Sequence, residues 1–137
     1  MRVLLDANVI VSALLSRTGA PARLIDLWLS GAFDLVVCPA LLLEVERAIA
    51  YPKIRSQVKP TDAEEVLRFL REEAEVVPDP EGPPAVRTQD PGDDYLVALA
   101  ARENVLLVSG DQHLRALGDD AAVASPRDFL DALEKIQ

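Results

Sequence analysis

The chain has 137 residues and a formal net charge of −9, from 23 acidic and 14 basic side chains, with one cysteine and one histidine. A single cysteine excludes a disulfide within the chain, and one cysteine with one histidine leaves too few ligands for a cysteine/histidine zinc site. The acidic balance counts against a general DNA binder with a broad basic face. It is compatible with a nucleic acid enzyme whose site is bridged by divalent cations.

The length and composition predict a single folded domain over residues 1–137. Half of the residues are hydrophobic, which excludes a disordered chain and provides a core. Asp6 and Asn8 interrupt the apolar N-terminal run, so we expect no signal peptide. No stretch reaches the roughly 18 to 20 apolar residues that span a bilayer. We therefore expect a soluble protein, and the lack of a disulfide framework favours the cytoplasm.

Short apolar runs alternate with helical patterns along the chain, and this alternation predicts βαβ units and a parallel sheet. Residues 3–5 form an expected buried strand that ends on Asp6, and an apolar helix follows Asn8. A second helix is expected to begin at Pro21 and to stop before Gly31. It carries too many apolar side chains for one face. This helix is therefore either sandwiched in the core or part of a dimer or partner surface.

The middle of the chain predicts a strand over residues 33–37, a helix over 40–50, a helix opened by a capping box over 61–64, and an edge-like strand over 75–77. In the helix over 40–50, Val45 centres the apolar stripe. Glu44 and Glu46 lie on opposite flanks, each about 100° from that centre. Periodicity therefore leaves open which of the two glutamates faces a site.

The last third of the chain is the most strongly patterned. After a loop over residues 78–91 with five prolines, Asp93 and Asp94 open an apolar helix that stops at Asn104. A strand over residues 105–108 then runs into the polar turn Ser109-Gly110-Asp111. A short helix over 113–117, a strand over 123–124 and a final helix capped by Ser125 complete the expected elements.

Acidic side chains follow the ends of two expected strands, those over residues 3–5 and 105–108, and such ends share one edge of a parallel sheet. We expect four acids to gather there: Asp6, Glu44 or Glu46, Asp93 or Asp94, and Asp111. Two carboxylates about 4 Å apart repel by roughly 4 kcal/mol at an effective dielectric of about 20, so four require a cation. Oxygen ligands favour Mg²⁺ or Mn²⁺ over zinc. Each acid alone also has a structural interpretation, as a turn residue or a helix cap.

Four segments, in order, resemble the four acidic motifs of PIN-domain nucleases, in particular the VapC-like toxin components of toxin–antitoxin systems. They are Leu4-Leu5-Asp6-Ala7-Asn8-Val9, Leu41-Leu42-Leu43-Glu44-Val45, Asp90-Pro91-Gly92-Asp93-Asp94-Tyr95-Leu96 and Val108-Ser109-Gly110-Asp111. The likeness covers nearly the whole chain at suitable spacing. One such motif would be weak evidence, whereas four in order are specific.

This resemblance implies a fold of the α/β class, a three-layer α/β/α sandwich with a central parallel sheet, and hydrolysis of phosphodiester bonds, usually in RNA, with Mg²⁺ or Mn²⁺. It assigns the catalytic and metal-binding acids to Asp6, Glu44, Asp94 and Asp111, the orienting polar residues to Asn8 and Ser109, and a neighbouring or alternate ligand to Asp93. It also implies a cognate antitoxin and a homodimer. Cys38 stands where relatives often carry Ser or Thr, which predicts a weaker cap for the following helix.

Two other functions fit part of the pattern. A receiver-like, phosphoryl-accepting domain also gathers acids around Mg²⁺, but it needs a lysine near the acidic pocket, and the turn from Ser109 to Asp111 has none. A binding module could keep the fold without activity, although the presence of all four acids counts against it. Five cations could guide a phosphate backbone locally or could simply be solvated: Arg17, Arg23, Arg47, Lys53 and Arg55. His113, two residues after Asp111, could touch the substrate or the metal shell, but a surface histidine at a helix start is the favoured interpretation.

Overall fold

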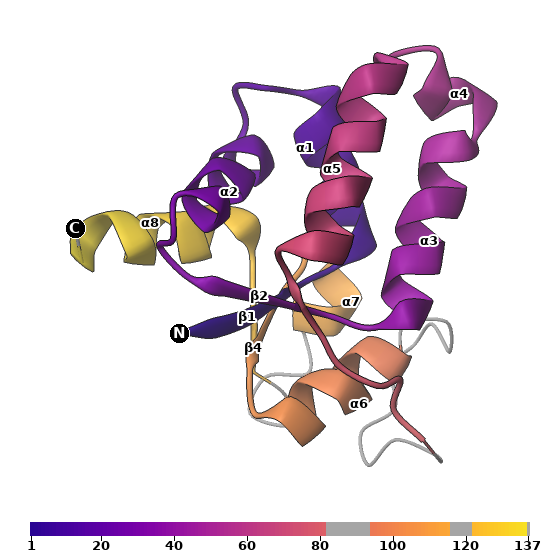
Figure 1. Cartoon of the computed structure of the whole chain (residues 1–137). Helices are drawn as coiled ribbons and strands as arrows, with labels where there is room; N and C mark the ends of the chain where they lie inside the picture. Colours follow the sequence, from indigo (N-terminus) through magenta and orange to yellow (C-terminus); the bar gives the residue numbers. More distant parts are fainter. Residues whose placement is uncertain (82–93, 116–121, 137) are drawn as a thin grey trace.

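The computed structural model describes residues 1–81, 94–115 and 122–136, without the side chains of Asp94, His113 and Arg115. The elements follow one another as β1 (Arg2–Leu5), α1 (Ala7–Leu15), α2 (Ala20–Leu29), β2 (Asp34–Val37), α3 (Pro39–Ala50), α4 (Pro52–Arg55), α5 (Pro60–Glu72), β3 (Glu75–Val76), α6 (Asp94–Glu103), β4 (Leu106–Val108), α7 (Gln112–Arg115), β5 (Val123–Ala124) and α8 (Pro126–Ile136). Figure 1 shows their arrangement.

The five strands form one sheet in the order β3-β2-β1-β4-β5, and every neighbouring pair is parallel. Leu4 at the centre is in register with Val36 on one side and Leu107 on the other. The chain builds β2 and β3 on one side of β1 and then returns to build β4 and β5 on the other. The strand order therefore reverses between β1 and β4, where open α/β sheets bind their ligands.

The central strands are short runs of Val and Leu because helices cover both faces of the sheet. Val3, Leu4 and Leu5 are fully buried. Figure 1 shows α1, α3 and α5 on one side of the sheet and α6 on the other, which makes three layers. The expected three-layer α/β/α fold with a central parallel sheet is confirmed, and β3 lies at the sheet edge as predicted.

Helix α2 is part of the core. Six of its ten residues are buried, because α2 contacts α1 on one side and α8 on another. Next to it, the Phe33 and Phe129 rings meet edge to face with centroids 5.3 Å apart. Its apolar surface is therefore largely used within the chain, and Leu29, at 42% exposure, is its exposed large apolar side chain.

The ends of the helices agree with the sequence in most places. Gly31 and Asn104 both have positive φ, as expected at helix stops, and the Ser125 hydroxyl caps α8 by accepting from the Asp128 amide at 3.0 Å. The predicted capping box over residues 61–64 is wrong, because α5 begins at Pro60 and its N-cap, Lys59, makes no side-chain cap bond. Helix α4 was not predicted. In the described part of the chain, no helix is long and apolar enough to span a membrane.

Candidate functional site

Asp6 lies at the carboxyl end of β1, beside the end of β4. Its amide donates to the Val108 carbonyl at 3.0 Å and extends the strand pairing by one residue. Asp6 is also the N-cap of α1, and its Oδ1 accepts from the Asn8 amide at 3.2 Å. The residue is only 1% exposed. The strand and the helix thus hold this carboxylate at the point where the strand order reverses.

Ser109 connects Asp6 to the turn after β4. Its hydroxyl donates to Asp6 Oδ2 at 2.8 Å, and its Oγ accepts from the Asp111 amide at 3.0 Å. Ser109 is fully buried, and Asp111 is half-buried. One hydroxyl therefore fixes the backbone of Asp111 next to the Asp6 carboxylate.

Glu44 and Tyr95 join α3 to α6. The Tyr95 hydroxyl donates to Glu44 Oε1 at 2.5 Å, and both side chains are half-buried. Burial raises the pKa of the Tyr95 phenol well above its usual range, and the Glu44 and Asp6 carboxylates raise that pKa further. The phenol therefore keeps its proton and can donate to Glu44. This hydrogen bond links α6 to α3 at Glu44.

The structure distinguishes the two glutamates that periodicity left open. Glu44 turns toward α6 and Tyr95. Glu46 is exposed and forms an ion pair with Arg71 of α5, with 3.4 Å between Oε1 and the guanidinium. Glu44 is therefore the glutamate on the side of α6, and Glu46 lies on the flank of α3 that faces α5.

The start of α3 is capped from a distant segment. Cys38, the N-cap residue, makes no side-chain cap bond, but Asp79 Oδ1 accepts from the Ala40 amide at 2.8 Å. Arg102 of α6 donates to the carbonyls of Pro78 and Asp79. Burial raises the pKa of the Cys38 thiol to about 11, and the Asp79 carboxylate contributes to this rise. The weaker cap expected at Cys38 is thus offset by Asp79.

Three predicted site residues remain: Asn8, Asp93 and Asp94. Asn8 is exposed, and its backbone amide makes the bond to Asp6. The backbone of Asp94 opens α6, but its side chain lies outside the described residues, as does the whole of Asp93. Among the side chains that are described, no three Asp, Glu, His or Cys residues form a group that could hold a metal ion.

The chemistry of the described residues nevertheless fits a hard divalent cation. Both Asp6 oxygens accept hydrogen bonds from neutral donors, and no Lys or Arg in the described ranges forms an ion pair with this carboxylate. A buried carboxylate without a cationic partner is costly. Asp6, Glu44 and Asp111 offer only oxygen atoms, the donor type that Mg²⁺ and Mn²⁺ prefer.

Two polar residues of this region were missed in the sequence. Tyr95 sits in the apolar run that begins α6, and a phenol in such a run needs a hydrogen-bond partner. Asp79 lies between two prolines of an otherwise featureless loop. Tyr95 could have been found from the sequence, because its hydroxyl would need a hydrogen-bond partner inside the fold. Asp79 had no local signal, because its partner is 39 residues away.

Comparisons with known proteins agree with the fold. The model of the PIN domain family matches residues 2–113. An uncharacterized protein of Methanocaldococcus jannaschii is 24% identical over 147 residues, and the alignment covers 98% of this chain and 93% of that protein.

Solved structures share the fold at lower identity. The structure of VapBC2 from Rickettsia felis, bound to a DNA fragment from their promoter, has a TM-score of 0.62 at 13% identity and covers 91% of this chain and 98% of that chain. A protein from Pyrobaculum aerophilum has a TM-score of 0.65 at 18% identity, covering 98% and 90%. FitAcB from Neisseria gonorrhoeae has a TM-score of 0.59 at 16% identity, covering 91% and 98%.

Proposed function

The chain belongs to the PIN domain family, and from this premise we propose that it is a metal-dependent ribonuclease that acts as the toxin of a toxin–antitoxin pair. The observation that carries the proposal is the Asp6 carboxylate, buried where the strand order reverses and bonded to the serine that also holds Asp111. Such a charge at the ligand-binding edge of an α/β sheet calls for a cation.

The proposed metal ligands are four acids: Asp6, Glu44, Asp94 and Asp111. Bound Mg²⁺ or Mn²⁺ would supply a water of lowered pKa and would neutralise charge on the phosphate. The chain's own part is to hold the carboxylates in place. Ser109 and the Asn8 amide orient Asp6, and Tyr95 orients Glu44. Asp93, next to Asp94, is the alternate ligand, and no side chain is needed as a nucleophile.

RNA is the proposed substrate, and a cognate antitoxin is the proposed partner. Support for the antitoxin comes from the likeness of the four acidic segments to VapC-like toxins and from the fold shared with VapBC2, whose structure was solved with a DNA fragment from its promoter. We further propose a homodimer in the cytoplasm. Exposed apolar side chains such as Leu43 and Leu29, at 45% and 42% exposure, are available for either protein contact.

Replacing Asp6 by Asn tests the enzyme directly. We expect the wild-type protein to cleave RNA with Mg²⁺ or Mn²⁺ and not in EDTA. Asp6→Asn should lose more than about 100-fold in rate, because a ligand carboxylate becomes neutral, while its circular dichroism spectrum stays that of the wild type. In a bacterial host, wild-type expression should arrest growth, Asp6→Asn should not, and co-expression of the adjacent gene's product should relieve the arrest.

Glu46→Gln is the matched control, because it removes one negative charge from α3 on the flank away from Tyr95. It should cleave RNA like the wild type. If the wild-type protein cleaves neither RNA nor DNA with either metal, the enzyme proposal is wrong and the chain is a binding module of the same fold. Active protein that leaves growth unaffected would contradict the toxin proposal alone.

A further inference from the structure

Residues 47–59 carry a concentration of positive charge in an acidic protein. This segment, which we call the α3–α4 corner, comprises the end of α3, all of α4 and the turn into α5. It contains four of the chain's 14 basic residues and no acidic residue, whereas the whole chain has a net charge of −9. Its cations are Arg47, Lys53, Arg55 and Lys59.

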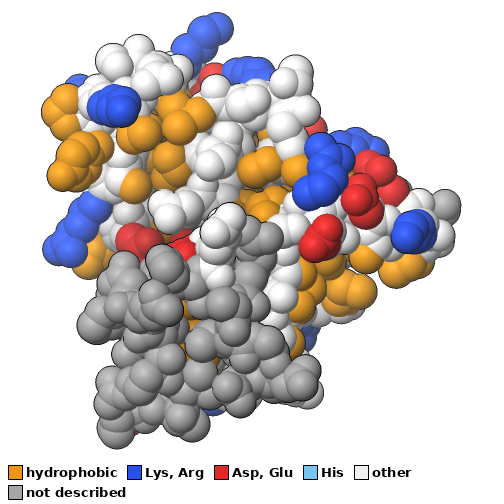
Figure 2. Space-filling view, turned by 180° about the vertical axis from the view of Figure 1, so that it is seen from behind, with side chains coloured by type: hydrophobic (Ala, Val, Ile, Leu, Met, Phe, Trp, Pro, Cys, Tyr) orange, Lys and Arg blue, Asp and Glu red, His pale blue; other side chains and the backbone are white. Residues whose placement is uncertain are grey.

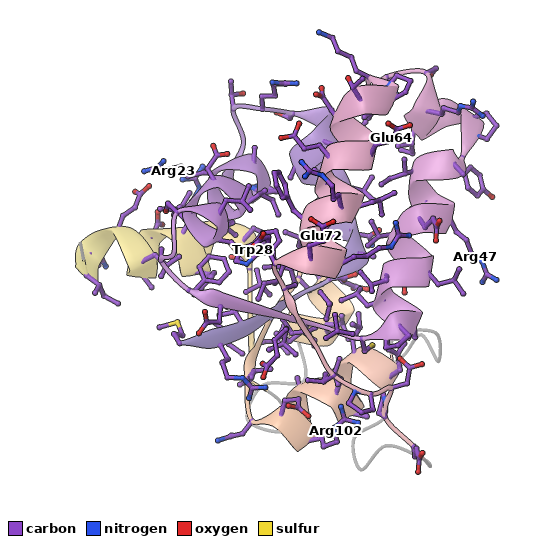
Figure 3. The ribbon with its side chains drawn as sticks, viewed as in Figure 1. Arg23, Trp28, Arg47, Glu64, Glu72 and Arg102 are labelled. Carbon is purple, nitrogen blue, oxygen red and sulfur yellow. The ribbon has the colours of Figure 1, made fainter. Side chains whose placement is uncertain are left out.

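The four cations of the α3–α4 corner are exposed, and within the described ranges none of them forms an ion pair. Elsewhere the described arginines are mostly paired: Arg2, Arg17, Arg23, Arg71, Arg102 and Arg127 each contact a carboxylate. Arg47 points away from the body of the molecule in Figure 3. The corner therefore offers charge that the fold does not use.

Tyr51 is exposed among these cations. It lies between α3 and α4 and is 69% exposed, far more than the half-buried Tyr95. An exposed aromatic ring beside unpaired cations is the arrangement with which proteins bind single-stranded nucleic acid, because the cations follow the phosphates and the ring stacks on a base.

The α3–α4 corner begins one helical turn from the candidate site. Arg47 is three residues after Glu44 on α3, so the two side chains are neighbours on the helix surface. From Glu44 the axis runs about 10 Å to Tyr51, at about 1.5 Å per residue. Figure 1 shows α3 leading from the neighbourhood of α6 to α4. In the reverse view of Figure 2, basic side chains stand at the upper border and at the left, the side on which α3 and α4 lie, and others stand at the right beside acidic side chains.

We propose that the α3–α4 corner is a binding surface for the backbone of single-stranded RNA, which holds the substrate on one side of the cleavage site, with Tyr51 stacked on a base. This inference rests on the proposed ribonuclease function. A polyanion is repelled by most of an acidic protein and attracted at this corner, so the corner sets the direction from which the strand reaches the acids. An acidic polypeptide is the competing ligand, but it would leave the exposed ring of Tyr51 without a base on which to stack.

The test measures binding without catalysis. Fluorescence anisotropy with a labelled single-stranded RNA of about 12 nucleotides, in EDTA, gives the affinity of the whole chain at several salt concentrations. The triple variant Arg47→Ala, Lys53→Ala, Arg55→Ala should bind more than tenfold more weakly at low salt. The plot of the logarithm of the association constant against the logarithm of the salt concentration has a negative slope. In the triple variant this slope should be less steep by about 2, since each of the three lost phosphate contacts removes about 0.7.

A control with the same change of charge is available on the other side of the molecule. Arg23→Ala, Arg127→Ala, Lys135→Ala removes exposed cations from α2 and α8 and should leave affinity and slope unchanged. Equal losses in both triple variants would mean non-specific attraction and would overturn the inference, as would unchanged binding in the corner variant. If the corner variant loses affinity for a poly-glutamate peptide but keeps its affinity for RNA, the surface binds a polypeptide instead.

Tyr51 separates stacking from charge. Tyr51→Ala should weaken RNA binding about tenfold with no change in the salt slope, and Tyr51→Phe should bind like the wild type. In active protein, the corner variant should raise KM on long RNA and leave kcat unchanged. Absence of wild-type cleavage would contradict the proposed function only, because the binding measurements do not depend on it.

Discussion

The Tyr95 hydroxyl donates a hydrogen bond to Glu44, and this bond can be removed with little change in the shape of the tyrosine side chain. A hydrogen bond to a charged group contributes about 1.5–3 kcal/mol, so its loss should affect whatever Glu44 binds. We expect Tyr95→Phe to lower kcat/KM on RNA about tenfold and to weaken Mn²⁺ binding to the metal-free protein, measured by titration calorimetry. Tyr51→Phe, at the chain's second tyrosine, is the control. Wild-type Mn²⁺ affinity in Tyr95→Phe would show that Glu44 needs no such support.

Several individual residues could be placed from the sequence because strand ends carry a clear signal. Asp6 and the turn from Ser109 to Asp111 follow apolar runs that stop abruptly, and both lie at the carboxyl edge as expected. Glu44 could not be separated from Glu46 by periodicity, since both flank the buried stripe. Their difference comes from partners on other elements, Tyr95 and Arg71, whose positions depend on the packing of whole helices.

At the scale of elements, the start of α3 depends on the loop after β3. Removing an N-cap acceptor costs about 1 kcal/mol, so Asp79→Ala should lower the free energy of unfolding by about that amount in denaturant titration. In that background Cys38→Ser should restore most of the loss, because a serine at the N-cap supplies its own acceptor. The Cys38 pKa should also fall below about 11 in Asp79→Ala, since a neighbouring negative charge is gone.

The double-mutant cycle decides whether the two positions share one role. In the wild-type background Cys38→Ser should change stability little, since Asp79 already bonds the Ala40 amide. Glu81→Ala removes a nearby exposed charge that caps no helix and should have no effect. Additive effects of Asp79→Ala and Cys38→Ser would mean that Asp79 acts by something other than capping.

Most elements were predicted because the alternation of apolar runs and helical patterns is strong, and their order then implied the parallel sheet. The errors lie at proline-led helix starts. Pro60 occupies the first turn of α5, a normal place for proline, so the pattern over residues 61–64 resembled a cap but began two residues after the actual N-cap, Lys59. Helix α4 is four residues long and is too short for a periodic signal.

At the scale of the whole molecule, the sequence does not decide whether α2 lies in the core or on a partner surface. The outcome depends on α8, which follows α2 by about a hundred residues in the chain. Contact between these helices turns an apparent excess of apolar surface into core. The location of charge is likewise a property of the fold. The net charge of −9 counts against a broad basic face, yet the structure leaves the four cations of residues 47–59 exposed and, within the described ranges, without ion pairs.

The metal proposal makes a prediction about the stability of the whole chain. A ligand that binds only the folded state stabilises it by about 2.7 kcal/mol at 100 times its Kd. For a domain of this size the Tm should rise by about 5–15 °C when saturating Mn²⁺ is added to the wild-type protein. Differential scanning calorimetry measures this shift, with KCl at equal ionic strength to exclude simple screening.

In Asp6→Asn, Mn²⁺ should no longer raise the Tm, because this variant lacks the buried carboxylate among the proposed metal ligands. In Glu46→Gln, Mn²⁺ should raise the Tm as in the wild type. Without metal, Asp6→Asn should be at least as stable as the wild type, since it neutralises a buried carboxylate that forms no ion pair within the described ranges. A Tm that rises equally in Asp6→Asn and the wild type would place the cation elsewhere. A wild-type Tm that responds to neither Mg²⁺ nor Mn²⁺ would remove the metal from the proposed mechanism.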